Sequence, residues 1–267
     1  MRLQGKTAVV TGAAGNGNMG QTIARRLAAE GARVLVTGRH APELERLAAE
    51  IDGEWLTADI TRREDDFALA AAARERLGEV DILVNAVGIN LLVPFEETSE
   101  ADLRRVTDAH FIGPFMLFQA MLPAMREGGS VIQISSATAT IMLNDHAAYM
   151  GSKAATDHLV RCIANEYGAR GIRANSISPG LTETPMTADA KAVPGVWDAY
   201  LASYPLGRVG TSHDIAAAVV WLASDECFMS GQNLQVNGGL TLRGNPSRDL
   251  IDRYVIERTG KPRSRSH

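Results

Sequence analysis

The chain has 267 residues, of which 45% are hydrophobic and 22% charged, and its formal net charge is −4. These values are typical of a globular protein with a large core, and α/β chains of this length are commonly single domains. The acidic balance argues against nonspecific binding to nucleic acid. No apolar run approaches the ~20 residues that a membrane-spanning helix needs.

The cysteines and the first residues indicate the compartment. Cys162 and Cys227 are far apart and match neither a disulfide framework nor a zinc site. Polar residues follow Met1 directly, so no signal peptide is expected. We therefore expect a cytoplasmic protein without a bound metal.

The chain begins with a strand, a glycine-rich loop and a helix. Thr7–Thr11 is a β-branched run typical of a buried strand, and Gln21–Glu30 has helical periodicity. The loop between them, residues 12–20, leads to a helix N-terminus, whose free N–H groups and dipole suit a pyrophosphate. The pattern predicts a nucleotide site, although a glycine loop can also be a simple tight turn.

The end of the second predicted strand, Arg33–Thr37, bears on the choice of cofactor. In dinucleotide folds this position faces the adenosine ribose, where a carboxylate binds a 2′-hydroxyl and an arginine accommodates a 2′-phosphate. Here Gly38 and Arg39 follow, without an acid. Arg39 therefore favours NADP over NAD, unless it is only a solvated loop residue.

The remaining chain alternates strands and helices, as in a parallel sheet with right-handed crossovers. We expect Ser212 to cap a helix and Thr182–Tyr204 to be a loosely structured, functional flap. The other expected strands are Glu54–Thr57, Asp81–Val84, Val131–Ile134, Ile172–Ile177 and Asn233–Val236, and the other expected helices begin at Pro42 or span Phe67–Leu77, Thr98–Met125, Ala147–Arg170 and Ser212–Ala223.

Two residues of the helix predicted at Ala147–Arg170 carry the chemistry. Tyr149 and Lys153 are four residues apart and therefore share one face. An ammonium group lowers the pKa of a nearby phenol from its ordinary value near 10, which makes the phenol a usable acid or base. A serine at the end of the preceding strand could hold a substrate oxygen beside it. Taken alone, the pair is more readily explained as an aromatic residue and a lysine on a partly solvated helix face.

Together these features resemble the short-chain dehydrogenase/reductase family over residues 3–242. The resemblance implies one Rossmann-fold domain, residues 1–242, with a doubly wound parallel sheet of about seven strands and helices on both faces. It also implies hydride transfer between NADP or NAD and a carbonyl or secondary alcohol. The matching features are Thr11-Gly12, Asp59, Asn85-Ala-Val-Gly88, Ser136, Tyr149-x-x-x-Lys153, Asn175, Pro179-Gly180-x-x-x-Thr184, Pro205-Leu-Gly-Arg208 and Val236-Asn-Gly-Gly239.

The resemblance assigns roles to these residues. Tyr149 would exchange a proton, Ser136 would bind the substrate oxygen, and Lys153 would lower the Tyr149 pKa and bind the nicotinamide ribose. Cofactor contacts are expected from Gly12, Gly15, Gly17, Met19, Gly20, Arg39, Asp59, Ile60, Asn85, Gly88, Tyr149, Lys153, Pro179, Gly180, Thr182 and Thr184. Substrate contacts are expected from Ser136, Asn144, His146, Tyr149 and Met186, with Met142, Leu143, Trp197 and Tyr200 forming an apolar wall. Pairing of the helices at Thr98–Met125 and Ala147–Arg170 would give a homotetramer or homodimer.

Three positions depart from the family pattern. The glycine loop has two extra residues, with Asn18 in place of the middle glycine, and Ala86 replaces an asparagine. His110 replaces the fourth catalytic residue, an asparagine whose carbonyl holds a relay water. Pro114 lacks the N–H that would bond the His110 carbonyl, so we expect a kinked helix and a surviving relay. The imidazole would line the cofactor pocket or add a pH-sensitive group; alternatively, it has no relay role.

Other functions remain open. A catalytically silent nucleotide-binding or scaffold protein is disfavoured by the intact Ser136, Tyr149 and Lys153. Enoyl reduction is disfavoured by the Ser-to-Tyr spacing. Residues 243–267 form a C-terminal extension, with a short amphipathic helix at Asp249–Glu257 and a basic tail at Lys261–His267 that we expect to be disordered. We expect a small-molecule substrate and no nucleic-acid or membrane partner.

Overall fold

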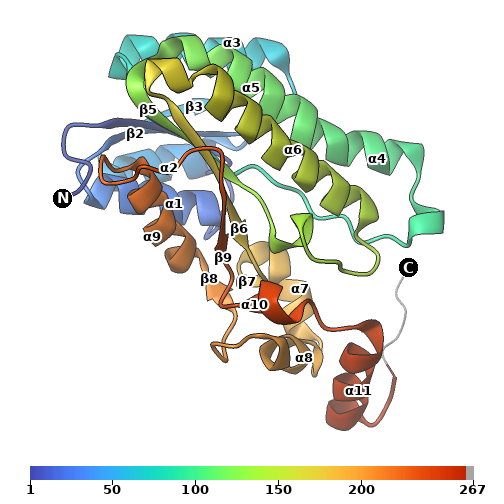
Figure 1. Ribbon diagram of the computed structural model, residues 1–267. Helices are drawn as coiled ribbons and strands as arrows, with labels where there is room; N and C mark the ends of the chain where they lie inside the picture. Colours follow the sequence, from blue (N-terminus) through green and yellow to red (C-terminus); the bar gives the residue numbers. More distant parts are fainter. Residues whose placement is uncertain (263–267) are drawn as a thin grey trace.

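The computed structural model of the chain describes residues 1–262 and is built around one parallel sheet (Figure 1). Its strand order is β3-β2-β1-β4-β5-β6-β9, which confirms the expected doubly wound fold. The direction of winding reverses between β1 and β4, and ligands of such sheets bind beyond the carboxyl ends of the strands at this point. The strands are β1 (Thr7–Thr11), β2 (Arg33–Gly38), β3 (Glu54–Thr57), β4 (Val80–Asn85), β5 (Met125–Ile134), β6 (Arg173–Pro179) and β9 (Asn233–Val236).

The central strands are buried because their sequences are apolar on both faces. Every residue of β1 and of β4 is buried, and the two strands pair in register with Val9 opposite Leu83 and Val10 opposite Val84. Continuous apolar runs of this kind are characteristic of parallel strands that helices cover from both sides. The sheet therefore holds the carboxyl ends of β1, β4, β5 and β6 in fixed positions beside one another.

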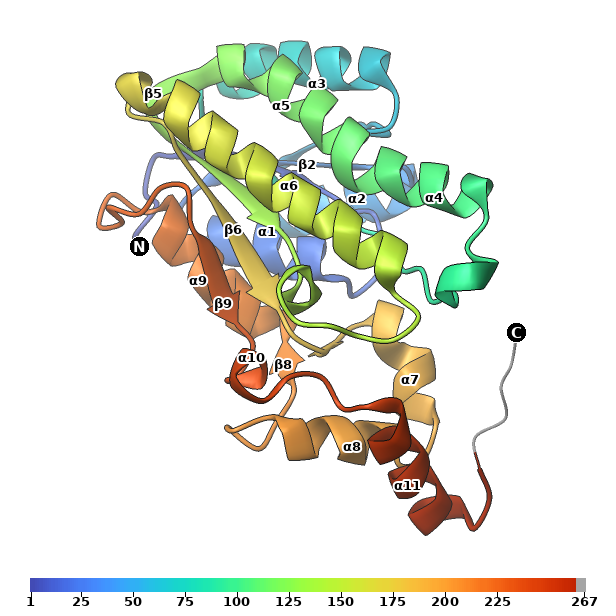
Figure 2. The same cartoon turned by 45° about the vertical axis from the view of Figure 1, so that its right-hand side comes forward.

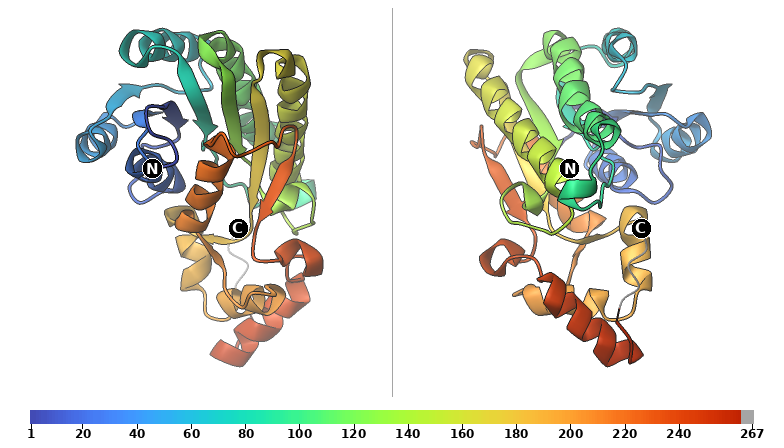
Figure 3. Two further views of the ribbon diagram at one scale, coloured as in Figure 1. Left: turned by 60° about the vertical axis from the view of Figure 1, so that its left-hand side comes forward. Right: turned by 90° about the vertical axis from the view of Figure 1, so that its right-hand side faces the viewer.

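Helices cover both faces of this sheet (Figures 1 and 3). On one face, Ile23, Leu27 and Val219 belong to a core cluster that includes side chains of β1, β2 and β4. On the other face, Leu69 and Leu117 belong to a second cluster. The first layer contains α1 (Met19–Ala29), α2 (Ala41–Ile51) and α9 (Ser212–Ala223); the second contains α3 (Arg63–Leu77), α5 (Gly113–Met121) and α6 (Ala147–Glu166), and α4 (Glu100–Thr107) precedes α5.

Two details of the helices correct the sequence-based expectations. The N-cap of α9 is Thr211 rather than Ser212, because Thr211 and Asp214 form a reciprocal capping box. The flap at Thr182–Tyr204 is more regular than expected. It contains α7 (Ala188–Ala192), α8 (Val196–Ser203) and the short strand β7 (Thr182–Glu183), which pairs with β8 (Gly210–Thr211).

The C-terminal extension packs onto this flap (Figure 2). After α10 (Leu240–Arg243), α11 (Arg248–Thr259) confirms the expected helix. Ile251 and Val255 of α11 form a small apolar cluster with Val196 and Ala199 of α8. The last five residues of the expected disordered tail, 263–267, lie outside the described residues. None of the described helices has the length and apolar character required to cross a membrane.

Candidate active site

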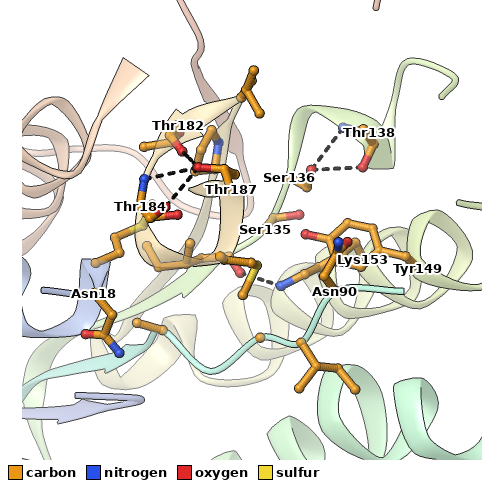
Figure 4. A pocket seen from close by; sticks show the side chains of 18 of the residues that line it. Asn18, Asn90, Ser135, Ser136, Thr138, Tyr149, Lys153, Thr182, Thr184 and Thr187 are labelled. Carbon is orange, nitrogen blue, oxygen red and sulfur yellow. Dashed lines mark hydrogen bonds between the residues drawn. The ribbon is translucent and has the colours of Figure 1, made fainter. Parts of the chain in front are cut away.

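A cavity of about 580 Å³ opens beyond the carboxyl ends of the strands, between the glycine loop and the flap (Figure 4). It brings together most of the residues expected from the sequence. Five of them, Gly17, Asn85, His110, Met142 and Trp197, do not line it. The expected residues that do line it are Gly12, Gly15, Met19, Gly20, Arg39, Asp59, Ile60, Gly88, Ser136, Leu143, Asn144, His146, Tyr149, Lys153, Pro179, Gly180, Thr182, Thr184, Met186 and Tyr200.

The glycine loop forms a tight cradle at one end of the cavity. Gly12 has a φ of 77°, and a Cβ there would lie 2.7 Å from the carbonyl carbon of Ala86. A Cβ on Gly20 would collide with the carbonyl oxygen of Gly12. Glycine is therefore required where the loop crosses β4 and where α1 begins. This is the close backbone approach that a bound pyrophosphate needs.

Asn18, which replaces the middle glycine, closes the loop rather than blocking it. Its Nδ2 donates to the Gly12 carbonyl at 2.8 Å, and its Oδ1 accepts from the Gln21 N–H at 2.9 Å. Asn18 is thus the N-cap of α1. No acceptor within the described residues is bonded to the N–H groups of Met19 and Gly20, and both residues line the cavity. They are suitable donors for a phosphate.

Arg39 and Asp59 lie at the same end of the cavity. The Arg39 side chain is 66% exposed, and its Nη1 is 3.8 Å from Asp59 Oδ2. The other carboxylate oxygen of Asp59 accepts from the N–H and hydroxyl of Thr61. An exposed ion pair of this length contributes little to stability, so Arg39 is free to reorient toward a ligand.

Tyr149 and Ser136 lie at the other end of the cavity (Figure 4). Ser136 Oγ is 2.8 Å from Thr138 Oγ1 and accepts from the Thr138 N–H. Burial raises the pKa of the Tyr149 phenol above its usual value, and hydrogen bonding to Ser136 partly opposes this rise. Lys153 is not among the causes of this shift, so burial rather than the ammonium group sets its direction in this arrangement.

Lys153 is hydrogen-bonded to the backbone at the end of β5. Its Nζ donates to the Ile134 carbonyl at 3.0 Å and lies 5.8 Å from the centroid of the Tyr149 ring. Burial lowers the Lys153 pKa to about 8, and the carboxylate of Asp157 opposes this effect. At neutral pH Lys153 therefore remains mostly an ammonium group, available to stabilise negative charge in the cavity.

His110 has a different place from the one expected. Its Nε2 accepts from the Ile89 N–H at 3.0 Å, and its Nδ1 is 3.0 Å from Ser152 Oγ. Because the Ser152 hydroxyl donates to the Tyr149 carbonyl, the Nδ1 of the imidazole carries the proton. Burial and the charge of Lys153 lower the His110 pKa to about 2. The imidazole neither lines the cavity nor titrates near neutral pH, so both expected roles are wrong.

The backbone at His110 only partly follows expectation. The helix widens into a π-helical turn over Asp108–Ile112, directly before Pro114. The Thr156 hydroxyl, from α6, donates to the His110 carbonyl. A carbonyl has two lone pairs, so a relay through its second lone pair stays a prediction.

Asn85 supports the site from behind. It is fully buried; its Oδ1 accepts from Thr11 Oγ1 at 2.7 Å and its Nδ2 donates to Gln133 Oε1 at 2.9 Å. These bonds join β1, β4 and β5 below the cavity floor. Asn85 therefore positions the strand ends and, contrary to expectation, does not line the cofactor cavity.

Several lining residues were not found from the sequence. Thr138 follows Ser136 in the chain, but Asp145 and Arg248 meet only in the folded protein. Two residues expected in the apolar wall are not in it. Met142 is exposed, and Trp197 packs in a cluster with the lining residue Leu240 but does not itself line the cavity. Ser135, the neighbouring serine that the spacing to Tyr149 disfavoured, also lines the cavity. Further lining residues without a local signal in the sequence are Asn90, Val196, Leu240, Asn245, Pro246 and Ile251.

Comparison with known proteins assigns most of the chain to one family of proteins. The family profile described as Enoyl-(Acyl carrier protein) reductase matches residues 12–241. The chain is 36% identical to D-threitol dehydrogenase of Mycolicibacterium smegmatis, covering 91% of this chain and 95% of that protein. It is 38% identical to galactitol 2-dehydrogenase (L-tagatose-forming) of Cereibacter sphaeroides, covering 90% and 97%.

Its fold is equally close to solved structures. A short-chain type dehydrogenase/reductase from Mycobacterium ulcerans superposes with a TM-score of 0.88 at 28% identity, covering 94% of this chain and 98% of that one. Fold, cavity and sequence similarity lead to one conclusion. The chain belongs to the short-chain dehydrogenase/reductase family of Rossmann-fold oxidoreductases.

Proposed function

We propose that this protein interconverts a secondary alcohol and a ketone, or a primary alcohol and an aldehyde, with an NADP-preferring site. One observation carries the proposal: Ser136, Tyr149 and Lys153 meet at one end of a cavity whose other end is the glycine loop. A bound nicotinamide would supply or accept the hydride. The cradle at Gly12 and the free N–H groups of Met19 and Gly20 fit its pyrophosphate.

The protein's own groups would move the proton. In reduction, the Tyr149 hydroxyl donates its proton to the substrate oxygen as hydride reaches the carbonyl carbon, while Ser136 donates a hydrogen bond to that oxygen. In oxidation, the phenolate takes the proton back. The Lys153 ammonium stabilises the phenolate and can bind the ribose hydroxyls. Because burial raises the Tyr149 pKa, reduction should persist at neutral pH and oxidation should increase as pH rises.

NADP preference is supported by the surroundings of Arg39. No carboxylate follows β2 in the sequence, and the exposed guanidinium reaches the cavity beside Asp59. The Arg39 guanidinium would donate a charge-assisted hydrogen bond to a 2′-phosphate. Its 3.8 Å ion pair with Asp59 is long enough to give way to this contact. A cytoplasmic location is supported by the two free cysteines.

The test is turnover with a matched pair of tyrosine variants. Native protein should change NADPH absorbance with a panel of ketones and aldehydes, and NADP with the corresponding alcohols. Tyr149→Phe removes one hydroxyl and should reduce kcat about 10²–10⁴-fold without weakening NADPH binding. Tyr167→Phe, in the turn after α6, should retain native kcat.

Two results would favour other functions. Tight NADPH and NADH binding without turnover of any carbonyl or alcohol would indicate a catalytically silent nucleotide-binding protein. The description of the matching family profile favours enoyl reduction as a second candidate, so the panel includes an enoyl thioester. Reduction of its carbon–carbon double bond, without reduction of ketones, would replace the proposed activity.

A further inference from the structure

The C-terminal extension forms one wall of the cavity. Asn245, Pro246, Arg248 and Ile251 all line it, although they follow the last strand of the sheet. The segment is held from outside by α8, through the apolar cluster of Ile251 with Val196 and an ion pair between Arg258 and Asp198. It is therefore a fixed part of the described fold.

Two polar contacts join this wall to the loop that precedes α6. Nη2 of Arg248 is 2.7 Å from each carboxylate oxygen of Asp145. Asn245 Nδ2 donates to the Met142 carbonyl at 3.0 Å. Asp145 has a φ of 63°, a left-handed conformation that aspartate tolerates better than most residues. Its carbonyl accepts from the Val93 N–H at 2.8 Å, which fixes the loop from its other side.

The charges on this wall cancel. Asp145 and Arg248 neutralise each other, and their side chains are only 22% and 39% exposed. His146, beside Asp145, has its pKa lowered by burial and is neutral near pH 7. The other charged residues that line the cavity are Lys153, which the reaction uses, and Arg39 and Asp59 beside the glycine loop. The adjacent Asn144 and Asn245 add uncharged amides to the same wall.

We propose that the Asp145–Arg248 ion pair is the specificity determinant of the substrate wall, and that it selects uncharged, hydrogen-bonding alcohols or ketones over substrates that carry a carboxylate. A substrate anion could bind Arg248 only by displacing Asp145, which would leave the Asp145 carboxylate without its partner. A hydroxyl or amide group can hydrogen-bond to the intact pair. This inference rests on the proposed function, because it names the substrate class for that site.

The experiment compares two ligands of similar size, one uncharged and one anionic. 4-Hydroxycyclohexanecarboxamide and 4-hydroxycyclohexanecarboxylate have nearly the same shape, and their affinity for the NADP-loaded protein is measured by calorimetry, with turnover measured in parallel. Native protein should prefer the amide. Asp145→Asn keeps the size of the side chain and frees Arg248, so the carboxylate-to-amide affinity ratio should rise about tenfold. Arg248→Ala should lower this ratio, because Asp145 then repels the anion.

Arg253→Ala is the matched control, since Arg253 is an exposed arginine on the same helix that does not line the cavity. Its carboxylate-to-amide affinity ratio should equal that of the native protein. An unchanged ratio in both Asp145→Asn and Arg248→Ala would overturn the proposal. So would a native preference for the carboxylate.

A second measurement needs no turnover. Hydrogen–deuterium exchange of the protein alone should increase at residues 141–146 and 248–259 in Arg248→Ala, and not in Arg253→Ala, while β1 and β4 stay protected in both. Unchanged exchange in Arg248→Ala would contradict the wall contact. These measurements distinguish failure of this inference from failure of the proposed function. If only the proposed function were wrong, the native protein would turn over no alcohol, but the exchange pattern and the carboxylate-to-amide affinity ratio would still report the ion pair.

Discussion

The His110 imidazole is a buried base whose hydrogen bonds favour the neutral ring. Its Nε2 already accepts from the Ile89 N–H, so protonation would break that bond and place a second positive charge near Lys153. The ring also packs edge-on against Tyr149, with centroids 5.1 Å apart. His110 is thereby a positioning residue for the tyrosine and for the backbone at Ile89.

This arrangement predicts a pH-dependent stability. The His110 pKa is about 2 in the folded protein and about 6.5 when unfolded, so the unfolded state binds one more proton between these values. The free energy of unfolding therefore falls as pH drops below 6.5, by about 1.4 kcal/mol per pH unit from this residue. His110→Asn should remove that slope between pH 6 and 4 in chemical denaturation. His158→Asn, at an exposed position of α6, should leave the slope unchanged. If the unfolding free energies of the native protein and of His110→Asn fell in parallel with pH, the assignment would be contradicted.

Arg39 predicts the choice of cofactor. A charge-assisted hydrogen bond contributes about 1.5–3 kcal/mol, so Arg39→Ala should raise the Kd for NADPH by about one to two decades. The Kd for NADH should stay nearly unchanged. Binding is measured by fluorescence titration, with Arg74→Ala, an exposed arginine of α3, as the control. Equal native affinity for both cofactors would refute the preference.

Helix α3 contains a buried acid in its first turn. Asp66 is fully buried, and neither carboxylate oxygen has a hydrogen-bond partner within the described residues. Burial, reinforced by the charges of Asp65 and Asp59, raises its pKa to about 8. A carboxylate in the first turn of a helix is normally favourable, but here the cost of burying the charge is larger.

Asp66→Asn should therefore stabilise the protein most at slightly alkaline pH. Between the unfolded pKa near 3.8 and the folded pKa of about 8, the folded state binds the extra proton, so native stability falls as pH rises. The variant lacks this loss. Its gain in unfolding free energy should be below about 1 kcal/mol at pH 4 and about 4 kcal/mol at pH 7, measured by denaturant titration. Glu75→Gln, exposed on the same helix, should give no such trend, and a pH-independent effect of Asp66→Asn would disprove the shift.

Across the molecule, the outer faces of α4, α5 and α6 are candidates for self-association. Phe115 is 42% exposed on α5, and Phe111 and Leu159 are half-buried. Phe118 and Ile163, which the sequence suggested for the same interface, are buried in the core of their own chain. The apolar surface available for pairing is therefore smaller than the sequence implied. The residues that remain exposed still lie on the helices that the family resemblance assigns to the interface.

We expect a homotetramer, or failing that a homodimer, at micromolar concentration. Phe115→Glu would place a charge in the paired surface and should shift the mass toward the monomer in light scattering. Phe67→Glu alters a similarly exposed phenylalanine on α3 and should keep the native mass. A monomeric native protein would contradict the expectation.

The sequence by itself determined those features that depend on neighbours along the chain. The β-branched runs, the glycine loop before α1 and the four-residue spacing of Tyr149 and Lys153 each specify a local conformation, and alternating strands and helices leave few ways to form a parallel sheet. The fold and the family followed from these patterns, and so did the expectation that Ser136, Tyr149 and Lys153 line one cavity.

Only the tertiary structure decided what depends on burial and on contacts between distant segments. Asp145 and Arg248 are 103 residues apart, and no local pattern connects them. The raised pKa of Tyr149 and the lowered pKa of His110 both arise mainly from desolvation, which is a property of the packed interior. Contacts between distant segments also explain why Asn85 does not line the cavity. Its position in β4 is encoded locally, but the hydrogen bonds that bury its amide come from β1 and β5.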